Sequence, residues 1–359
     1  MPSQCTAASV RSTSHGDKYF KHSRNNMKAF IIDSYKPKDG MRMAEVADPV
    51  AGENDVLVRI HAAGVNLLDS KIKAGEFKAM LPYKLPLVMG HDVAGEVVKT
   101  GAGVKKFKAG DQVYARPADY RIGTFAQLIA IHEADVAPMP GSLSMEEAAS
   151  IPLVGLTAWQ ALVEKANLKK GQKVFIQAGS GGVGTFAIQL AKHLGATVAT
   201  TTSAANIELV KSLGADVVID YRTQDFETIL KDYDVVLNSQ DAKTLEKSLR
   251  ILRPGGKLIS ISGPPDVAFA RKAGLNPLLR IVMFLLSFAT KRKARRLGVD
   301  YSFLFMWADG NQLGKITELI NSGIIRPVLD KVFPFPQAND ALAYVESGRA
   351  KGKVVIKVT

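Results

Sequence analysis

The stretch KVFIQAGSGGVGTFAIQLAKHLGA (173–196) decides the fold of this 359-residue chain. It opens with an apolar run typical of a buried strand, and its second half places apolar residues along one face of a helix. The same alternation continues downstream, with predicted strands at 197–202, 216–220, 233–238 and 256–262 and predicted helices at 206–214 and 244–252. Strands that alternate with helices predict a parallel sheet covered by helices on both faces.

The turn between the first strand and helix has the spacing G-x-G-x-x-G (179–184). In such a turn one glycine permits a tight bend, another lets the backbone approach a pyrophosphate, and the last lets helix and strand pack closely. The helix N-terminus then offers N–H donors to the phosphates. The sequence therefore predicts an α/β fold with a doubly wound Rossmann sheet, a dinucleotide site, and four phosphate-loop residues: Ser180, Gly181, Gly182 and Val183.

The end of the second strand predicts which dinucleotide binds. An NAD enzyme normally has Asp or Glu there, about 20 residues after the glycine turn, to hold the ribose hydroxyl. Here Thr201, Thr202 and Ser203 stand in that place, with Thr201 where the acid is expected. Hydroxyl groups accept a 2′-phosphate that a carboxylate would repel, so NADP is predicted. Tyr221 is a further candidate donor, and Arg349, Lys351 and Lys353 are candidate sources of positive charge.

The rest of the chain predicts a second domain. Residues 27–152 contain short β-branched runs separated by Gly, Pro and Asp, the pattern of an irregular β-rich domain. Residues 153–300 form the predicted Rossmann NADP-binding domain. The last strand, in GKVVIKV (352–358), has no local partner. We therefore expect residues 301–359 to return and mostly complete the β-rich catalytic domain.

Composition restricts the other possibilities. The chain has one cysteine, Cys5, which fits a reducing compartment and leaves no multi-cysteine zinc site. Its net charge of +13 is spread along the sequence, so nucleic-acid binding is unlikely. Residues 1–26 are rich in Ser, Arg, Lys and His and lack the apolar segment of a secretory signal. They predict a disordered or targeting extension, and the location is predicted as cytoplasmic, or organellar if that extension is a transit peptide.

One segment does not fit the alternation. Residues 278–289 (LLRIVMFLLSFA) are almost wholly apolar, and the basic run KRKARR (291–296) follows. Twelve residues are too few to span a bilayer as a helix, which needs about 20. The preferred interpretation is a buried helix with a solvated basic tail. The alternative, peripheral membrane or partner contact through 278–296, stays open.

At this point the sequence resembles a known family. It is similar to the medium-chain dehydrogenase/reductase superfamily, in its zinc-independent quinone oxidoreductase and enone reductase branch. The resemblance covers nearly all of 27–359 and is carried by AAGVNLLDSKIKAG (62–75), LPLVMGHDVAGEVVKTGAGVKKFKAGDQVYA (85–115), GTFAQL (123–128), GLTAWQAL (155–162), AGSGGVGTFAIQLAKHLGA (178–196) and GRAKGKVVIKV (348–358). It implies a GroES-like β-domain, an active site in the cleft between the two domains, and a homodimer.

The resemblance also implies site residues. Besides the phosphate loop, it places these residues at the cofactor: Asn66, Thr157, Thr202, Ser203, Tyr221, Asn238, Ser262, Gly263, Phe303 and Lys353. The zinc alcohol dehydrogenases of this superfamily have a ligand cysteine where this chain has Asn66, a histidine at His91, and a second cysteine near Leu153. With His91 alone, no zinc site is predicted.

The implied reaction is hydride transfer from NADPH to a quinone or to the β-carbon of an α,β-unsaturated carbonyl compound. The resulting enolate needs hydrogen-bond donors and a proton. Asn66 and Lys71 are the predicted catalytic donors, with Asp69 orienting Lys71, although Asp69 and Lys71 would equally make an ordinary surface pair. Tyr83 and Tyr120 are candidate pocket residues.

Other functions remain open. An enzyme of the same fold would serve a nitroalkene, a 2-alkenal or a simple aldehyde. The +13 charge also allows an NADPH-binding regulatory or nucleic-acid-binding protein with weak catalysis. A peripheral membrane quinone reductase is the third alternative, and the segment 278–296 would serve it.

Overall fold

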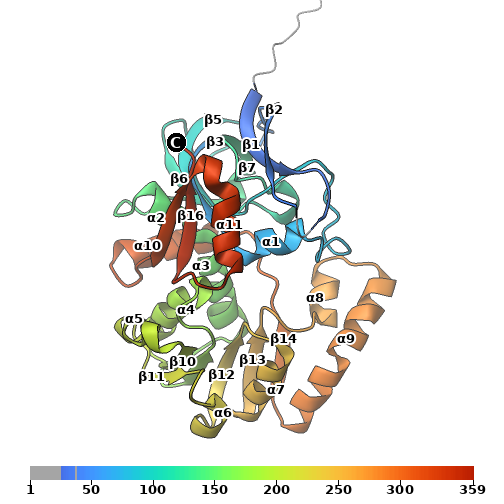
Figure 1. Ribbon diagram of the computed structural model, residues 1–359, viewed down its shortest axis with the longest axis vertical. Helices are drawn as coiled ribbons and strands as arrows, with labels where there is room; N and C mark the ends of the chain where they lie inside the picture. The colour runs from blue at the N-terminus through green and yellow to red at the C-terminus, as the bar shows by residue number, and fades with distance from the viewer. Residues whose placement is uncertain (1–25, 37–38) are drawn as a thin grey trace, which may run out of the picture.

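The computed structural model describes residues 26–36 and 39–359. The predicted extension 1–26 lies outside the described residues except for Asn26, which begins the first strand. Figure 1 shows a β-rich part in the upper half of the molecule and an α/β part in the lower half, with the C-terminal segment in the upper half.

The lower part is built on a parallel sheet of six strands in the order β11-β10-β9-β12-β13-β14. All five neighbouring pairs are parallel. The strands are β9 (Lys173–Ile176), β10 (Thr197–Thr202), β11 (Val217–Asp220), β12 (Tyr233–Asn238), β13 (Leu252–Ser260) and β14 (Asp300–Phe303). The helices of this part are α3 (Pro152–Trp159), the π-helix η3 (Gln160–Lys165), α4 (Gly182–His193), α5 (Ile207–Ser212), α6 (Phe226–Ile229), α7 (Ala242–Arg250), α8 (Val267–Lys272) and α9 (Pro277–Arg296).

The chain forms the central strand β9 first and adds β10 and β11 on one side of it. It then crosses to the other side of β9 and adds β12, β13 and β14 there. The strands are apolar on both faces because helices cover both, as the fully buried Val174, Phe175 and Ile176 of β9 illustrate. The predicted α/β fold with a doubly wound sheet is confirmed. The strand order reverses between β9 and β12, and doubly wound sheets bind ligands outside the carboxyl ends of their strands at such a reversal.

The upper part contains a seven-stranded sheet in the order β15-β16-β3-β5-β6-β8, with β7 also paired to β3, and a three-stranded sheet in the order β2-β1-β4. The strands are β1 (Asn26–Ile32), β2 (Arg42–Ala47), β3 (Asp55–Val65), β4 (Leu87–Val88), β5 (Val93–Thr100), β6 (Gln112–Ala115), β7 (Leu128–His132), β8 (Val136–Pro138), β15 (Leu329–Pro334) and β16 (Lys353–Lys357). The helices here are α1 (Leu67–Lys73), α2 (Met145–Ala149), α10 (Gly310–Asn321) and α11 (Ala338–Glu346). The short 3-10 helices of this part are η1 (Asp119–Arg121), η2 (Glu133–Asp135) and η5 (Phe335–Gln337), and η4 (Ala204–Asn206) lies between β10 and α5 in the lower part.

The C-terminal strand β16 pairs antiparallel with β3, so the end of the chain lies in the sheet that its first third builds. Strand β14, in contrast, pairs with β13 although it extends past residue 300. The division into 27–152, 153–300 and 301–359 therefore remains a proposal, and β14 places its second limit a few residues later.

Helix α9 corrects one prediction. The preferred interpretation of residues 278–289 as a buried helix is wrong, because the apolar side chains point outward: Leu278 is 70% exposed and Leu285 is 66% exposed. Only a narrow stripe that includes Met283, Ser287 and Ala294 is buried. The helix lies outside the edge strand β14, so one side packs and the other faces solvent (Figure 1). Within the described part of the chain, no helix is long and apolar enough to cross a membrane.

Candidate active site

The predicted cofactor residues of the Rossmann sheet meet at the carboxyl ends of its strands. The glycine turn follows β9, Thr202 ends β10, and Asn238 ends β12. Ser262 and Gly263 follow directly after β13. Parallel strands bring all of these positions to one edge, which explains why residues 80 positions apart in the sequence share a site.

The glycine turn is required by close packing. A Cβ atom at Gly179 would lie 2.2 Å from the Thr200 hydroxyl oxygen, and one at Gly184 would lie 2.3 Å from the Ala178 carbonyl oxygen. Real Cβ contacts are not that short, so helix α4 approaches the sheet this closely only because both residues are glycine. Gly181 stands before the helix in an extended conformation, and α4 begins at Gly182. The N–H groups in the first turn of α4 have no acceptor within the helix. They therefore point out of the helix at the glycine turn, as a phosphate site requires.

Ala178 enters the turn with a positive φ of 51°, which is unfavourable for a residue with a side chain. Two hydrogen bonds hold this bend: the Ala178 N–H donates to the Thr201 hydroxyl at 3.1 Å, and the Gly179 N–H donates to the Thr201 carbonyl at 2.9 Å. Thr201 is buried and occupied by this task. The expectation that Thr201 occupies the position of the NAD-binding acid is therefore wrong.

Thr202 and Ser203, which follow Thr201 at the end of β10, form the rim of the site beside the phosphate loop. The Thr202 hydroxyl donates to the Ser180 hydroxyl at 2.9 Å, and the Asn206 amide donates to the same oxygen at 3.3 Å and to the Ser203 hydroxyl at 3.3 Å. Ser203 is partly exposed, whereas Thr202 is buried. Ser203 is thus the position at the strand end that faces outward beside the phosphate loop.

Tyr221 lies beside this rim, because its N–H donates to the Thr202 carbonyl at 3.2 Å. Its side chain is exposed, and the Arg222 guanidinium lies 5.9 Å from its ring centroid. Sequence reasoning missed Arg222, because it looked for a cation in the 201–206 loop rather than on the neighbouring strand's exit. The pairing of β10 with β11 is what brings this cation to the rim.

The Asn238 side chain is buried and hydrogen-bonded to three neighbouring side chains, and it does not cap a helix. Its amide nitrogen donates to Gln177 Oε1 at 2.8 Å, and its Oδ1 accepts from the Ser260 hydroxyl at 2.6 Å and from the Ser262 hydroxyl at 3.4 Å. The Gly263 N–H also donates to the Ser260 hydroxyl, at 2.7 Å. These bonds join the ends of β9, β12 and β13, so they set the shape of the crevice floor.

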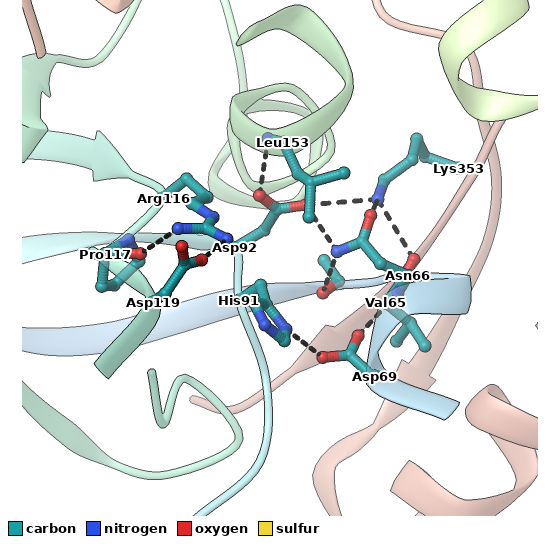
Figure 2. Close-up of polar contacts among 11 residues, drawn as sticks. Val65, Asn66, Asp69, His91, Asp92, Arg116, Pro117, Asp119, Leu153 and Lys353 are labelled. Carbon is teal, nitrogen blue, oxygen red and sulfur yellow. Dashed lines mark hydrogen bonds and ion pairs between the residues drawn. The ribbon is translucent and has the colours of Figure 1, made fainter. Parts of the chain in front are cut away.

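The other side of the site comes from the β-rich part. Figure 2 shows Lys353, Asn66 and Asp92 converging, from β16, the start of α1 and the loop before β5. Lys353 Nζ donates to Asn66 Oδ1 at 2.6 Å and to the Val65 carbonyl at 3.1 Å, and it lies 3.2 Å from Asp92 Oδ2. The Asn66 amide nitrogen donates to the same Asp92 oxygen at 2.9 Å. All three side chains are buried, so the Lys353 ammonium group and the Asp92 carboxylate form a buried ion pair.

The Asn66–Asp92–Lys353 network touches the glycine turn directly. A Cβ atom at Gly182 would lie 2.9 Å from Lys353 Cδ, and the Gly352 N–H donates to the Ser180 carbonyl at 2.8 Å. Lys353 was a candidate charge for the 2′-phosphate. The structure instead packs it against Gly182 and Asn66, with its ammonium group engaged by Val65, Asn66 and Asp92.

The prediction that Asp69 orients Lys71 is wrong, and so is a surface pair between them. Asp69 is fully buried: its Oδ1 lies 2.6 Å from His91 Nδ1, and its Oδ2 accepts the Asn66 N–H at 2.8 Å. Lys71 Nζ lies 3.9 Å from Glu76 instead, on a partly exposed surface. On helix α1 the two residues are only two positions apart, so their side chains point in different directions.

The donor atoms around His91 do not fit a zinc ion. His91 Nε2 is buried and has no hydrogen-bond partner in the part of the chain that the structure describes, so it is the one nitrogen there that could bind a metal. The Asn66 amide is held by Asp92 and Lys353, and Leu153 contributes only its N–H, which donates to Asp92 Oδ1 at 2.7 Å. Across residues 26–36 and 39–359, no group of three His, Cys, Asp or Glu side chains could hold a metal.

Aromatic side chains connect the two parts. Phe303 at the end of β14 packs edge-on against Phe269 of α8 at 5.3 Å, and Phe269 lies 5.8 Å from Phe305. Phe305 in turn lies 5.6 Å from Phe77 of the β-rich part. Thr157 is buried in α3, where its hydroxyl donates to the Leu153 carbonyl at 2.7 Å.

Tyr83 is a partly buried phenol whose hydroxyl oxygen is shielded from solvent. Burial raises its pKa well above the usual value, and the Asp119 carboxylate adds to the effect. Its hydroxyl has no hydrogen-bond partner among the described residues, and its ring lies 6.0 Å from that of the exposed Tyr120. The raised pKa keeps the Tyr83 phenol protonated near neutral pH.

A doubly wound sheet with a phosphate loop, facing buried polar groups of a β-rich domain, defines a dinucleotide-dependent oxidoreductase. Two family descriptions match the chain: "Alcohol dehydrogenase GroES-like domain" over residues 52–141 and "Zinc-binding dehydrogenase" over residues 213–356. The chain belongs to the medium-chain dehydrogenase/reductase superfamily, as its resemblance predicted. It is an NAD(P)H oxidoreductase similar to the quinone and alkenal/one reductase members.

Individual relatives cover nearly the whole chain. The NAD(P)H oxidoreductase RTN4IP1, mitochondrial, of Danio rerio is 35% identical over 93% of this chain and 92% of its own length. The NADPH-dependent alkenal/one oxidoreductase, chloroplastic, of Arabidopsis thaliana is 33% identical over 92% of this chain and 79% of its own. The solved quinone oxidoreductase from Coxiella burnetii superposes with a TM-score of 0.81 at 28% identity, covering 93% of this chain and all of that one.

We predict that Lys353→Met lowers the free energy of unfolding by about 3–5 kcal/mol, because Asp92 would remain buried without its cation. Adding Asp92→Asn should restore about 1 kcal/mol or more, since the uncompensated charge disappears. Urea titration measures both. Lys357→Met on the same strand is the matched control. Lys357 is 57% exposed and pairs with the partly exposed Glu146 at 3.0 Å, so the loss should stay below about 1 kcal/mol. Equal losses for the two lysine variants would contradict the role of Lys353.

Proposed function

We propose that the chain is a zinc-independent reductase that uses NADPH to reduce quinones or α,β-unsaturated carbonyl compounds. The observation that carries this proposal is the contact between Lys353 and Gly182, which sets the buried Asn66–Asp92–Lys353 network against the phosphate loop. The names of the mitochondrial and chloroplastic relatives support the substrate class. Within the crevice, a bound nicotinamide would supply a hydride.

The residues that would hold the cofactor follow from their positions. The N–H groups of Gly182 and Val183 begin α4 and would bind the pyrophosphate. Gly181, whose N–H donates to the Ala178 carbonyl at 3.0 Å, would shape the turn before them. Ser203, Tyr221 and Arg222 would surround the 2′-phosphate. Thr157, Asn238, Ser262, Gly263 and Phe303 would shape the crevice around the rest of the dinucleotide.

The substrate oxygen needs donors as negative charge develops on it. Asn66 has both ends of its amide occupied, so we assign it and Asp69 to positioning: Asp69 holds His91 and the start of α1. Lys71 is held only by a long contact to Glu76 and stays the predicted donor. Tyr83 is a second candidate, because its buried O–H has no other partner.

The cofactor preference is tested at Ser203. Ser203→Asp should weaken NADPH binding by about ten- to a hundredfold, because a carboxylate 4–5 Å from the 2′-phosphate repels it by roughly 3–4 kcal/mol before screening. NADH binding should hold or improve, because a carboxylate accepts from the ribose hydroxyl. Dissociation constants for both cofactors are the measurement. Ser203→Asn, of similar size and neutral, is the control; if it weakens NADPH binding as much, charge is not what the rim recognises.

The reaction is tested with purified protein, NADPH, and a panel of quinones, enones, alkenals and simple aldehydes, by following NADPH oxidation. We expect turnover of the quinones or enones and none of the saturated aldehydes. Lys71→Met should lower kcat by roughly a hundredfold to a thousandfold, as loss of an oxyanion donor does. Lys78→Met, an exposed lysine just past α1, should leave kcat unchanged. If both variants retain full activity, Tyr83→Phe becomes the next variant and the role of Lys71 is lost.

Independence from zinc is a separate prediction. The donor set around His91 offers one free nitrogen, so the purified protein should contain no stoichiometric zinc and chelators should leave NADPH oxidation unchanged. Elemental analysis with activity before and after chelation decides it. One zinc per chain, lost together with activity, would overturn the prediction.

Three further expectations stay predictions. A homodimer is expected, paired through an edge strand of the Rossmann sheet; the edges of the described parallel sheet are β11 and β14, and α9 lies against β14. The location is predicted as cytoplasmic, and the mitochondrial and chloroplastic names of the relatives favour the organellar alternative. A regulatory or nucleic-acid-binding protein with weak catalysis is the alternative, and it predicts at most slow reduction of every member of the substrate panel.

A further inference from the structure

Helix α9 presents a long apolar surface with no partner in the described part of the chain. Seven large apolar side chains of the helix are exposed: Leu278, Ile281, Val282, Phe284, Leu285, Leu286 and Phe288. An exposed leucine by itself is ordinary, but a contiguous set of this size on one helix marks an interaction surface. The helix spans 20 residues, about 30 Å, along the outer side of the molecule beyond β14 (Figure 1).

The same helix ends in cations. Its sequence contains no Asp or Glu, and its last six residues are Lys291, Arg292, Lys293, Ala294, Arg295 and Arg296. Lys291 pairs with Asp266 at 3.1 Å, and Lys293 pairs with Glu246. Among the ion pairs of the described residues, none involves Arg292, Arg295 or Arg296, and all three are exposed. They carry positive charge that the fold itself does not neutralise.

The apolar and cationic portions share one outward direction. At 100° per residue, positions 278, 285, 292 and 296 fall within about 40° of one another around the helix. The buried stripe of Met283, Ser287 and Ala294 lies on the opposite side. An outward face thus changes along its length from leucine to arginine. Ile281, Phe284 and Phe288 extend the apolar portion on one side, and Val282 and Leu286 extend it on the other.

We propose that α9 docks the protein onto an anionic membrane surface. Its apolar portion would enter the boundary between headgroups and acyl chains, and Arg292, Arg295 and Arg296 would contact lipid phosphates. Exposed leucine and phenylalanine gain by burial there, and each arginine near an anionic surface contributes further attraction. The helix is too polar at its C-terminal end to cross the bilayer, so it lies at the interface.

Charge distinguishes this occupant from a second copy of the chain. Two copies paired through α9 would each bring the same unpaired arginines, and the chain as a whole carries +13. An antiparallel pair of α9 helices would press those arginines against the partner's leucines and desolvate them without a counter-charge. Anionic phosphates supply the missing counter-charge, which a second copy lacks.

The test is co-sedimentation of the full chain with vesicles of phosphatidylcholine alone or mixed equally with phosphatidylglycerol. We expect binding to the mixed vesicles that weakens as salt rises. Arg292→Gln with Arg296→Gln should weaken it by about thirtyfold, which corresponds to about 1 kcal/mol for each arginine. Leu278→Gln with Leu285→Gln should weaken it by at least about tenfold, because two exposed leucines no longer enter the boundary. All four positions are exposed, so folding should be unaffected, and circular dichroism checks this.

The charge-matched control is Lys169→Gln with Lys231→Gln, two exposed lysines away from α9. It removes the same net charge and keeps residues 1–25, so it should bind like the wild type. Failure of the wild type to bind mixed vesicles would overturn the proposal, as would equal weakening in the α9 and control variants. Light scattering gives a third outcome: if the leucine variant turns a dimer into a monomer and leaves vesicle binding unchanged, α9 is an interface between copies and the proposal is wrong.

Discussion

The ammonium group of Lys353 is the contact on which the site depends. It contacts Asp92, which lies 261 positions earlier in the sequence, and Asn66, which lies 287 positions earlier. The methylene chain of Lys353 lies against the glycine turn of the parallel sheet. A buried lysine is stable only if its charge is paired and its donors are used, and both conditions hold here. The consequence is that the C-terminal strand, the first helix of the β-rich part and the phosphate loop are held together at one point.

The second constraint is steric. Gly179 and Gly184 have no room for a side chain, and Ala178 accepts a positive φ because Thr201 bonds the backbone there. Such strain is typical of a turn that must place N–H groups where a ligand's phosphates will lie. The same contacts engage the Thr201 hydroxyl and carbonyl oxygens, and for that reason we propose Ser203 and the residues beside it for recognition of the ribose phosphate.

Helix α9 stands apart from both constraints. Its contacts to the rest of the molecule use a narrow stripe of small and medium side chains, while its leucines and phenylalanines point away. No contact inside the described chain accounts for those side chains. An apolar face that changes into unpaired arginines along its length matches the layered chemistry of a lipid surface, in which hydrocarbon lies beneath phosphate.

The sequence by itself determined the sheet, the phosphate loop and the superfamily, because period-2 and period-3.6 apolar patterns and a glycine spacing are local properties that the chain carries in order. Only the tertiary structure decided the partners of individual polar side chains. Asp69 turns to His91 rather than Lys71, Lys353 goes to Asn66 and Asp92, and Arg222 reaches the rim through strand pairing. It also decided which side of α9 is buried, since an apolar run of twelve residues looks the same whether it faces a core or solvent. Each of these outcomes depends on residues far away in the sequence, whose arrival at one place is set by the order of the strands.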